Sequence, residues 1–305
     1  MHIPNGFCSE PLSLTAMLVV GGAMVYGALA KKEEKQVRPF SFFAAVCAFI
    51  FAAQMLNFPI GGGTSGHFMG GALAALLLGP WGALYALAVV LAVQGLFFAD
   101  GGMMAFGINA LNMGLVGGAL AWPLMKRLRS VLPEGKTGLL MTAFAGSWLS
   151  LMMASAVCAL ALAASGASPL AKVFPAMLTV HAQIGLGEAL MTATLVALLI
   201  KMRRTDLLPS WCGVQTRPVV AVENKRFVTA SLIIALMLAV LVSPFASAFP
   251  DGLEHVAQAQ GFIARAEDGI ALWTFDSNAM ANFAGVLLTF ISALAVGRFA
   301  QKRGV

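Results

Sequence analysis

Ile60-Gly61-Gly62-Gly63-Thr64-Ser65-Gly66-His67-Phe68-Met69-Gly70-Gly71 is the stretch that decides the fold, because it interrupts a series of apolar segments. A short apolar run, residues 67–79, follows the glycines and ends at Gly79-Pro80. This run is shorter than the ~20 residues that a helix needs to cross a bilayer. Irregular backbone at membrane depth is tolerated only where protein or a cavity surrounds it. The stretch therefore predicts a protein-lined site within a membrane protein.

The composition is that of an integral membrane protein. Hydrophobic residues make up 59% of the chain and charged residues 10%, and the mean hydropathy is +0.86. A soluble domain carries about 25% charged residues. Long apolar runs favour helices over a barrel. The sequence has no phosphate-binding GxxxxGK[ST] loop and no HExxH or GxSxG motif, so we expect neither ATP hydrolysis nor other catalysis in this chain.

The apolar segments predict an all-α, polytopic fold in two parts. Residues 1–204 are expected to form a seven-helix bundle, residues 205–226 a cytoplasmic linker, and residues 227–305 a two-helix auxiliary module. The expected membrane segments are residues 11–30, 40–58, 67–79 (the short one), 81–98, 104–125, 139–164, 174–200, 227–245 and 283–300.

The basic residues predict the orientation. With the N-terminus outside, all of the 19 Lys and Arg residues except Lys172 and Arg265 fall in inside segments. Cytoplasmic loops of membrane proteins carry such an excess of basic residues. The pattern predicts an outside N-terminus and a cytoplasmic C-terminus, and it explains the pI near 9.4 without a nucleic-acid partner.

The first residues, Met1-His2-Ile3-Pro4, could chelate a transition metal. The terminal amine, the backbone nitrogen of His2 and its Nδ1 close two adjacent chelate rings that are nearly coplanar, because the peptide unit is planar. His67 would supply a fourth nitrogen. Such a plane suits Ni²⁺ or Cu²⁺, fits Co²⁺ less cleanly, and does not suit Zn²⁺ or Mg²⁺. We expect Met1 to be retained, since His2 is large, and Thr64 or Ser65 to accept an imidazole N–H.

Two ionisable residues lie deep in the seventh apolar segment. His181 and Glu188 are seven residues apart and so share one helix face. Ionisable residues inside a membrane are functional candidates. A carboxylate–imidazole pair that supports the metal loop, a proton relay in a proton-coupled secondary metal transporter, and a polar pair that locks helix packing all remain open. Asp251, Glu254 and His255 could offer weak metal capture outside, but a solvated outside loop is the favoured expectation for them.

Three stretches together resemble a known family. They are Met1-His2-Ile3-Pro4-Asn5-Gly6-Phe7, the loop that carries His67, and His181-Ala182-Gln183-Ile184-Gly185-Leu186-Gly187-Glu188-Ala189. They resemble the substrate-binding membrane component, of CbiM/NikM type, of cobalt/nickel energy-coupling-factor transporters. The segment Pro250-Asp251-Gly252-Leu253-Glu254 resembles the small auxiliary subunit, here fused in the same chain.

The resemblance implies a plasma-membrane importer subunit with high affinity for a divalent metal. The metal would be held by the amine of Met1, the backbone and imidazole nitrogens of His2, and His67. Its partners would be a transmembrane coupling subunit and a pair of cytoplasmic ATPases. It would carry no permanent cofactor, only the transported Ni²⁺ or Co²⁺. Pro4 favours nickel as the transported ion, since nickel-type members of the family tend to have proline there. Asn5 departs from the acidic residue that is common in the family.

Overall fold

The computed structural model describes residues 1–29, 39–214, 221–267, 269, 271–273 and 277–302. Several basic residues used to predict the orientation lie outside the described residues, as does part of the predicted linker: Lys31, Lys32, Lys35, Arg38, Arg217 and Arg303. The described part is helical apart from one short β-hairpin, so the all-α expectation holds with that exception.

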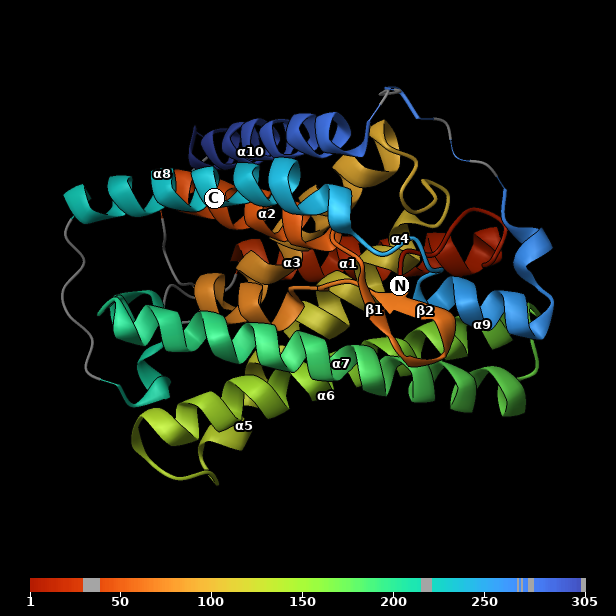
Figure 1. Ribbon diagram of the computed structural model, residues 1–305, viewed down its shortest axis with the longest axis horizontal. Helices are drawn as coiled ribbons and strands as arrows, with labels where there is room; N and C mark the ends of the chain where they lie inside the picture. The colour runs from red at the N-terminus through yellow and green to blue at the C-terminus, as the bar shows by residue number, and fades with distance from the viewer. Residues whose placement is uncertain (30–38, 215–220, 268, 270, 274–276, 303–305) are drawn as a thin grey trace.

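Seven helical segments in the described part are long and apolar enough to cross a membrane (Figure 1). They run Glu10–Leu29, Gly71–Phe97, Phe106–Arg129, Gly135–Ala164, Leu170–Lys201, Lys225–Phe245 and Asn278–Arg298. The apolar helix α2 (Phe40–Gln54) is shorter than predicted, because the chain turns at Met55 and enters a strand at Phe58.

The helices α1 (Glu10–Leu29), α6 (Gly135–Ala164) and α7 (Leu170–Lys201) are continuous. The segment between α3 and α6 is composite. It consists of α4 (Phe106–Asn109), a π-helical stretch (Ala110–Ala119) and α5 (Ala121–Arg129). The long helices α6 and α7 pack side by side along much of their length (Figure 1).

Helix α3 (Gly71–Phe97) combines the predicted third and fourth segments and breaks between them. Gly79 has non-helical backbone angles (φ 77°, ψ 176°) and precedes Pro80, which lacks the N–H of a regular helix. A straight helix of 27 residues would be about 40 Å long. Yet Gln54 bonds both the Met69 carbonyl and the Gln94 side chain, so the arms before and after Gly79 fold back beside each other. The predicted start at residue 67 was wrong, since residues 67–70 are not helical.

The glycine-rich stretch forms a β-hairpin rather than the expected irregular loop. Strand β1 (Phe58–Ile60) pairs antiparallel with β2 (Thr64–Gly66) across the turn Gly61–Gly63. Gly62 and Gly63 both have positive φ, 75° and 72°, which a residue without Cβ adopts at little cost. The hairpin ends directly at His67 and thereby fixes where this side chain lies.

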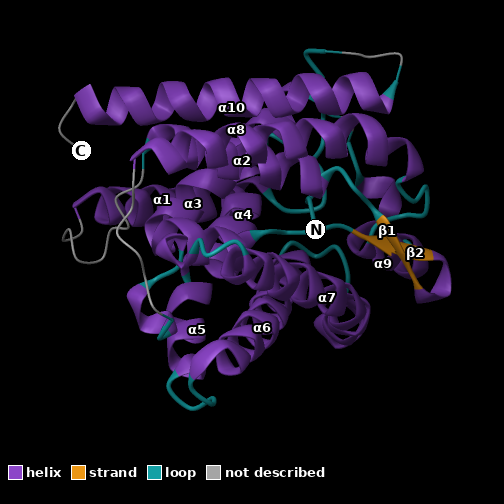
Figure 2. Ribbon diagram, turned by 60° about the vertical axis from the view of Figure 1, so that its left-hand side comes forward, coloured by secondary structure: helices purple, strands orange, loops and turns teal. Residues whose placement is uncertain are grey.

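The C-terminal part packs against the first part of the chain (Figure 2). Helices α8 (Ala221–Met237) and α10 (Asn278–Lys302) lie against α2, and α10 also contacts α3. Between them a short helix, α9 (Gly252–Gln260), contacts α7 and β2. Leu253 and Val256 of α9 share a buried cluster with Ile3 and Phe7 of the N-terminal segment. This contact brings the C-terminal part to the start of the chain.

Candidate metal site

The N-terminal segment is held in place by hydrogen bonds between its backbone and residues about 100 positions later in the chain. The Ile3 N–H donates to Asn109 Oδ1 (2.8 Å), and Asn109 Nδ2 donates to the Ile3 carbonyl (3.0 Å). The Gly102 N–H donates to the same carbonyl at 2.9 Å. Ile3 and Phe7 are 0% and 1% exposed. Asn109 thus fixes the residue that follows His2.

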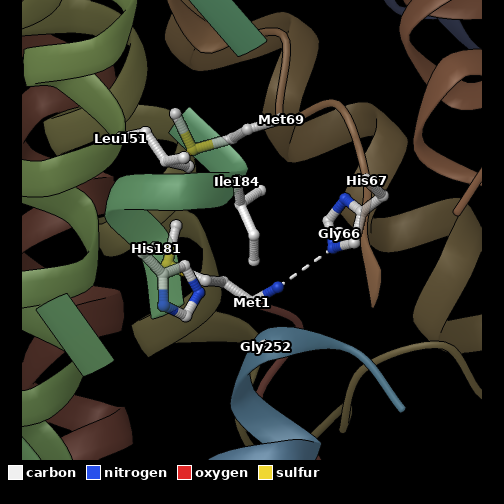
Figure 3. A pocket seen from close by; sticks show the side chains of 8 residues that line it. All are labelled: Met1, Gly66, His67, Met69, Leu151, His181, Ile184 and Gly252. Carbon is white, nitrogen blue, oxygen red and sulfur yellow. Dashed lines mark hydrogen bonds between the residues drawn. The ribbon is translucent and has the colours of Figure 1, made fainter. Parts of the chain in front are cut away.

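The amine of Met1 lies 3.0 Å from Nε2 of His67 (Figure 3). Adjacent nitrogens of a square-planar complex lie about 2.8 Å apart when each metal–nitrogen bond is about 2 Å. The separation therefore suits two neighbouring ligands of one ion. Among the described residues no group of three His, Cys, Asp or Glu could hold a metal.

The two predicted imidazole ligands lie together. Their rings stack with centroids 4.9 Å apart and planes 22° apart. His67 Nδ1 is 3.4 Å from the Phe68 carbonyl, so an N–H there leaves Nε2 as the lone-pair donor. Burial, then the positive charges of the Met1 amine and His2, lower the pKa of His67 well below its usual value. Burial also lowers the pKa of His2. Both rings are thus neutral near pH 7, as metal ligands must be.

Asp100 and Gln94 were not predicted as neighbours of His2. Oδ1 of Asp100 is 3.5 Å from Nδ1 of His2. The Gln94 side chain is fully buried near His2. Gln94 Nε2 donates to Gln54 Oε1 (2.9 Å), and Gln54 Nε2 donates to the Met69 carbonyl (2.8 Å). This amide chain runs from Gln94, which lies near His2, to the loop that carries His67.

Asp251 lies at the site, so the prediction of a solvated loop was wrong for this residue. Its Oδ2 is 3.3 Å from the Met1 amine and 3.9 Å from Nε2 of His67. Burial alone would raise the pKa of Asp251, but the Met1 amine and His67 outweigh it and hold that pKa well below its usual range. Its Oδ1 accepts the Glu254 N–H (2.8 Å) and so caps α9. One carboxylate therefore joins the C-terminal part to the N-terminus.

Substitutions of Asp251 should separate these two contacts. We expect Asp251→Asn to keep the cap of α9 and to loosen residues 1–7, because asparagine caps helices well but carries no charge. Asp251→Ala should loosen both segments. Loss of a cap costs about 1 kcal/mol, or roughly fivefold faster amide exchange in α9. Hydrogen–deuterium exchange of both segments measures this.

The control is Glu254→Gln, which changes an exposed side chain and keeps the backbone N–H that Asp251 accepts. It should leave exchange in both segments unchanged. Equal protection of α9 in the Asn and Ala variants of Asp251 would contradict the assigned cap.

Ser65 does not support an imidazole, contrary to the prediction. Its hydroxyl donates to the Phe249 carbonyl (2.7 Å), and its N–H donates to the Pro250 carbonyl (2.8 Å). Both groups of Ser65 thus join β2 to the segment before α9, where Ser65 and Asp251 form a parallel backbone bridge. Thr64 is buried, and no hydrogen bond joins it to an imidazole among the described residues. The imidazole N–H faces the Phe68 carbonyl instead.

His181 and Glu188 do not pair with each other. Glu188 accepts the N–H groups of Met69 (2.7 Å) and Gly70 (3.0 Å), at the start of α3. A carboxylate is favoured at a helix N-terminus. His181 Nδ1 is 2.8 Å from the carbonyl of Met177, one turn earlier in α7. Glu188 therefore fixes the backbone that follows His67, whereas His181 bonds its own helix.

A small cavity of about 10 Å³ lies beside the Met1 amine, and Figure 3 shows its lining. His67 and His181 contribute imidazoles from opposite sides of Met1, and Met69 contributes a thioether. The remaining lining residues are Gly66, Leu151, Ile184 and Gly252. A second, larger cavity of about 290 Å³ lies next to His2, Asp100 and Asp251.

Comparison with known proteins identifies both parts of the chain. Residues 2–205 match the CbiM family, described as the cobalt uptake substrate-specific transmembrane region, and residues 225–272 match the PDGLE domain. A solved structure described as that of a transition metal transporter superposes with a TM-score of 0.58 at 28% identity, covering 67% of this chain and 94% of that one.

Three relatives illustrate the similarity. One from Archaeoglobus fulgidus is 37% identical over 205 residues, 67% of this chain and 66% of that relative. The fused nickel transport protein NikMN of Rhodobacter capsulatus is 34% identical (68% of this chain, 64% of the relative). The aligned region thus spans just under two thirds of both. The cobalt transport protein CbiM of Sorangium cellulosum is 30% identical (68% of this chain, 91% of the relative).

Proposed function

Since the chain belongs to the CbiM family of cobalt-uptake substrate-specific transmembrane proteins, we propose that it binds Ni²⁺ or Co²⁺ with high affinity and carries it across the plasma membrane. This is a family of transport proteins and not of enzymes. The observation that carries the proposal is the 3.0 Å separation between the Met1 amine and His67 Nε2. Met1, His2 and His67 supply the four nitrogens. Glu188 supports the loop, and the metal is the transported substrate.

Nickel is the preferred substrate in this proposal. Four nitrogens in one plane suit Ni²⁺ better than Co²⁺. The relative from Rhodobacter capsulatus carries a nickel transport name, which supports the same choice. Titration of the purified protein with each ion, in competition with a chelator, should give the lower Kd for Ni²⁺. A lower Kd for Co²⁺ would reverse the preference but leave the site assignment intact.

The proposed topology has seven membrane segments in residues 1–204, a cytoplasmic linker in 205–226 and two segments in 227–305, with the N-terminus outside. The seven-segment count takes the two arms of α3 separately, which the break at Gly79 supports. Basic residues of α5 and the end of α7 lie at one end of the molecule, and α9 lies at the other (Figure 1). This arrangement supports a cytoplasmic end opposite the metal loop.

Energy for transport is proposed to come from separate subunits. The sequence has no phosphate-binding loop, and its family resemblance implies a transmembrane coupling subunit and two cytoplasmic ATPases. Cells that produce all of these subunits should accumulate radioactive Ni²⁺. Uptake should stop when the ATPases are inactivated and should persist when a protonophore dissipates the proton gradient. Uptake that survives ATPase inactivation would refute this part of the proposal.

The contacts of Glu188 argue against the proton-coupled alternative. Both of its oxygens accept backbone N–H groups at the start of α3, which gives this carboxyl group a structural role. His181, the other member of the proposed relay, bonds its own helix and not Glu188.

Glu188→Gln tests the two roles against each other. The amide keeps one acceptor oxygen but turns an NH₂ towards the other N–H, which costs about 1–3 kcal/mol for the buried group left unpaired. We expect weaker metal binding, because residues 67–70 shift, and a loss of uptake in proportion. Titration and uptake assays on the same variant measure both quantities. Normal binding with no uptake would instead favour the proton-coupled transporter.

A further inference from the structure

A cavity of about 460 Å³ lies where α6 begins and α7 ends, at the end of the molecule opposite α9 (Figure 1). Sites for small molecules measure about 300–1,000 Å³. Lys136 and Arg203 line the cavity, and both residues are exposed. Among the described residues, no carboxylate forms an ion pair with either of them. The cavity therefore offers two positive charges to a ligand.

A buried arginine adjoins this cavity. Arg129 is 9% exposed, and arginine carries a permanent positive charge. Its Nε donates to the Cys212 carbonyl (3.1 Å) and its Nη1 to the Pro133 carbonyl (2.8 Å), whereas no described residue accepts from its Nη2. A Cβ on Gly213, which lines the cavity, would lie 3.1 Å from that Nη2. Carbonyl groups are neutral, and a buried charge without a counterion is costly. An anion in the cavity would supply that counterion.

The backbone at the start of α6 adds hydrogen-bond donors. This helix of 30 residues begins at Gly135, which lines the cavity, and its N-cap residue Glu134 makes no side-chain capping bond. The first four N–H groups of a helix have no partners within the helix, and together with the helix dipole they favour a bound phosphate. The donors of α6 and the three basic side chains thus favour the same kind of ligand.

The surroundings of the cavity are those of a membrane–water interface. Trp211, two residues before Gly213, packs edge-on against Trp122 of α5 with ring centroids 5.3 Å apart. Tryptophan is enriched where lipid headgroups lie. Ile200 and Val214 give the cavity an apolar part beside its basic one. A ligand with a phosphate next to an apolar portion matches this lining.

We propose that this cavity binds the phosphate group of an anionic lipid. Lys136, Arg203 and Arg129 supply the positive charges, and the start of α6 supplies N–H groups. Basic pockets between membrane helices on the cytoplasmic side bind anionic headgroups in this way, and this end of the molecule is the cytoplasmic one in the proposed topology. The bound lipid joins the start of α6 to the end of α7. This inference goes beyond the proposed function and does not depend on the metal site.

Native mass spectrometry of the full chain in detergent micelles tests the proposal, with dioleoylphosphatidylglycerol and dioleoylphosphatidylcholine added separately. We expect tighter binding of phosphatidylglycerol, whose headgroup carries a net negative charge. The double variant Lys136→Gln/Arg203→Gln should weaken this binding about 25-fold, since each basic side chain contributes roughly fivefold. Both residues are exposed, so the variant should fold. Its binding of phosphatidylcholine should not change.

The matched control is Lys126→Gln/Arg127→Gln, which removes two exposed charges of α5 that do not line the cavity. It should bind phosphatidylglycerol as the unmodified chain does. An equal loss in both double variants, or equal binding of the two lipids by the unmodified chain, would overturn the inference. Displacement of the lipid by an equal concentration of inorganic phosphate would assign the cavity to a soluble anion instead. Normal lipid binding by the Lys136/Arg203 variant, with loss of the ATPase subunits on co-purification, would assign it to a protein partner and equally overturn the inference.

Discussion

One extra residue before Met1 should abolish high-affinity metal binding. The extension turns the Met1 amine into a peptide nitrogen and moves the free amine one residue away from His67, so the donor set beside His67 is changed. Space also opposes it, since Met1 is 4% exposed and the cavity beside its nitrogen measures about 10 Å³. The extension therefore removes the chelating amine and also does not fit into the buried position of Met1. Isothermal titration with Ni²⁺ should give no saturable binding at micromolar concentrations.

Two controls show whether the position of the added residue matters. A single residue added after Val305 should leave the Kd unchanged. A protease-cleavable extension should bind no metal before cleavage and should bind it normally once Met1 is released. An extended protein with the original Kd would mean that the amine is not a ligand.

Replacing His67 should have the second largest effect. His67→Ala removes the imidazole that lies 3.0 Å from the Met1 amine and stacks on His2. Loss of an in-plane ligand should raise the Kd for Ni²⁺ by more than the roughly 10- to 100-fold that loss of a supporting residue costs. The hairpin should survive, since strands β1 and β2 pair through backbone groups of residues 58–66. Competition with a metal indicator of known affinity measures the Kd.

His255→Ala is the matched control for this change. It removes a histidine from α9, outside the small cavity, and should leave the Kd unchanged. Far-ultraviolet circular dichroism should report the same helix content for both variants and the unmodified chain. If His67→Ala binds Ni²⁺ within about threefold of the unmodified chain, His67 is not one of the four donors.

Local sequence patterns were sufficient to predict the helices and the parts of the site that adjoin them. Apolar length predicted several helices that are long enough to cross a membrane, although the second is shorter than predicted and the third and fourth form one broken helix. Gly79-Pro80 marks that break. The chelating geometry of Met1-His2 is a property of adjacent atoms, so the sequence contains it in full. The structure brings Met1 next to His67, while their binding of a metal remains a prediction.

Contacts between distant segments could not be predicted in the same way. Asp251 is 250 residues from Met1 in sequence, and its carboxylate reaches the amine only because α9 packs on Ile3 and Phe7. Residues 250–252 alone indicate an exposed turn. Ser65 was misassigned for the same reason, since its partners Phe249 and Pro250 belong to the C-terminal part. A signal was present in Gln94 and Asn109, which are polar residues within apolar runs.

Native mass spectrometry of the purified chain incubated with Ni²⁺ tests the central claim most directly, because it reads the state of the N-terminus and the bound metal on the same molecules. Incomplete deformylation would give a mixture of free and formylated Met1 in one sample. We predict one Ni²⁺ on molecules with a free amine and none on formylated or extended ones. Equal occupancy by Ni²⁺ in both populations would contradict the claim that the amine of Met1 holds the metal.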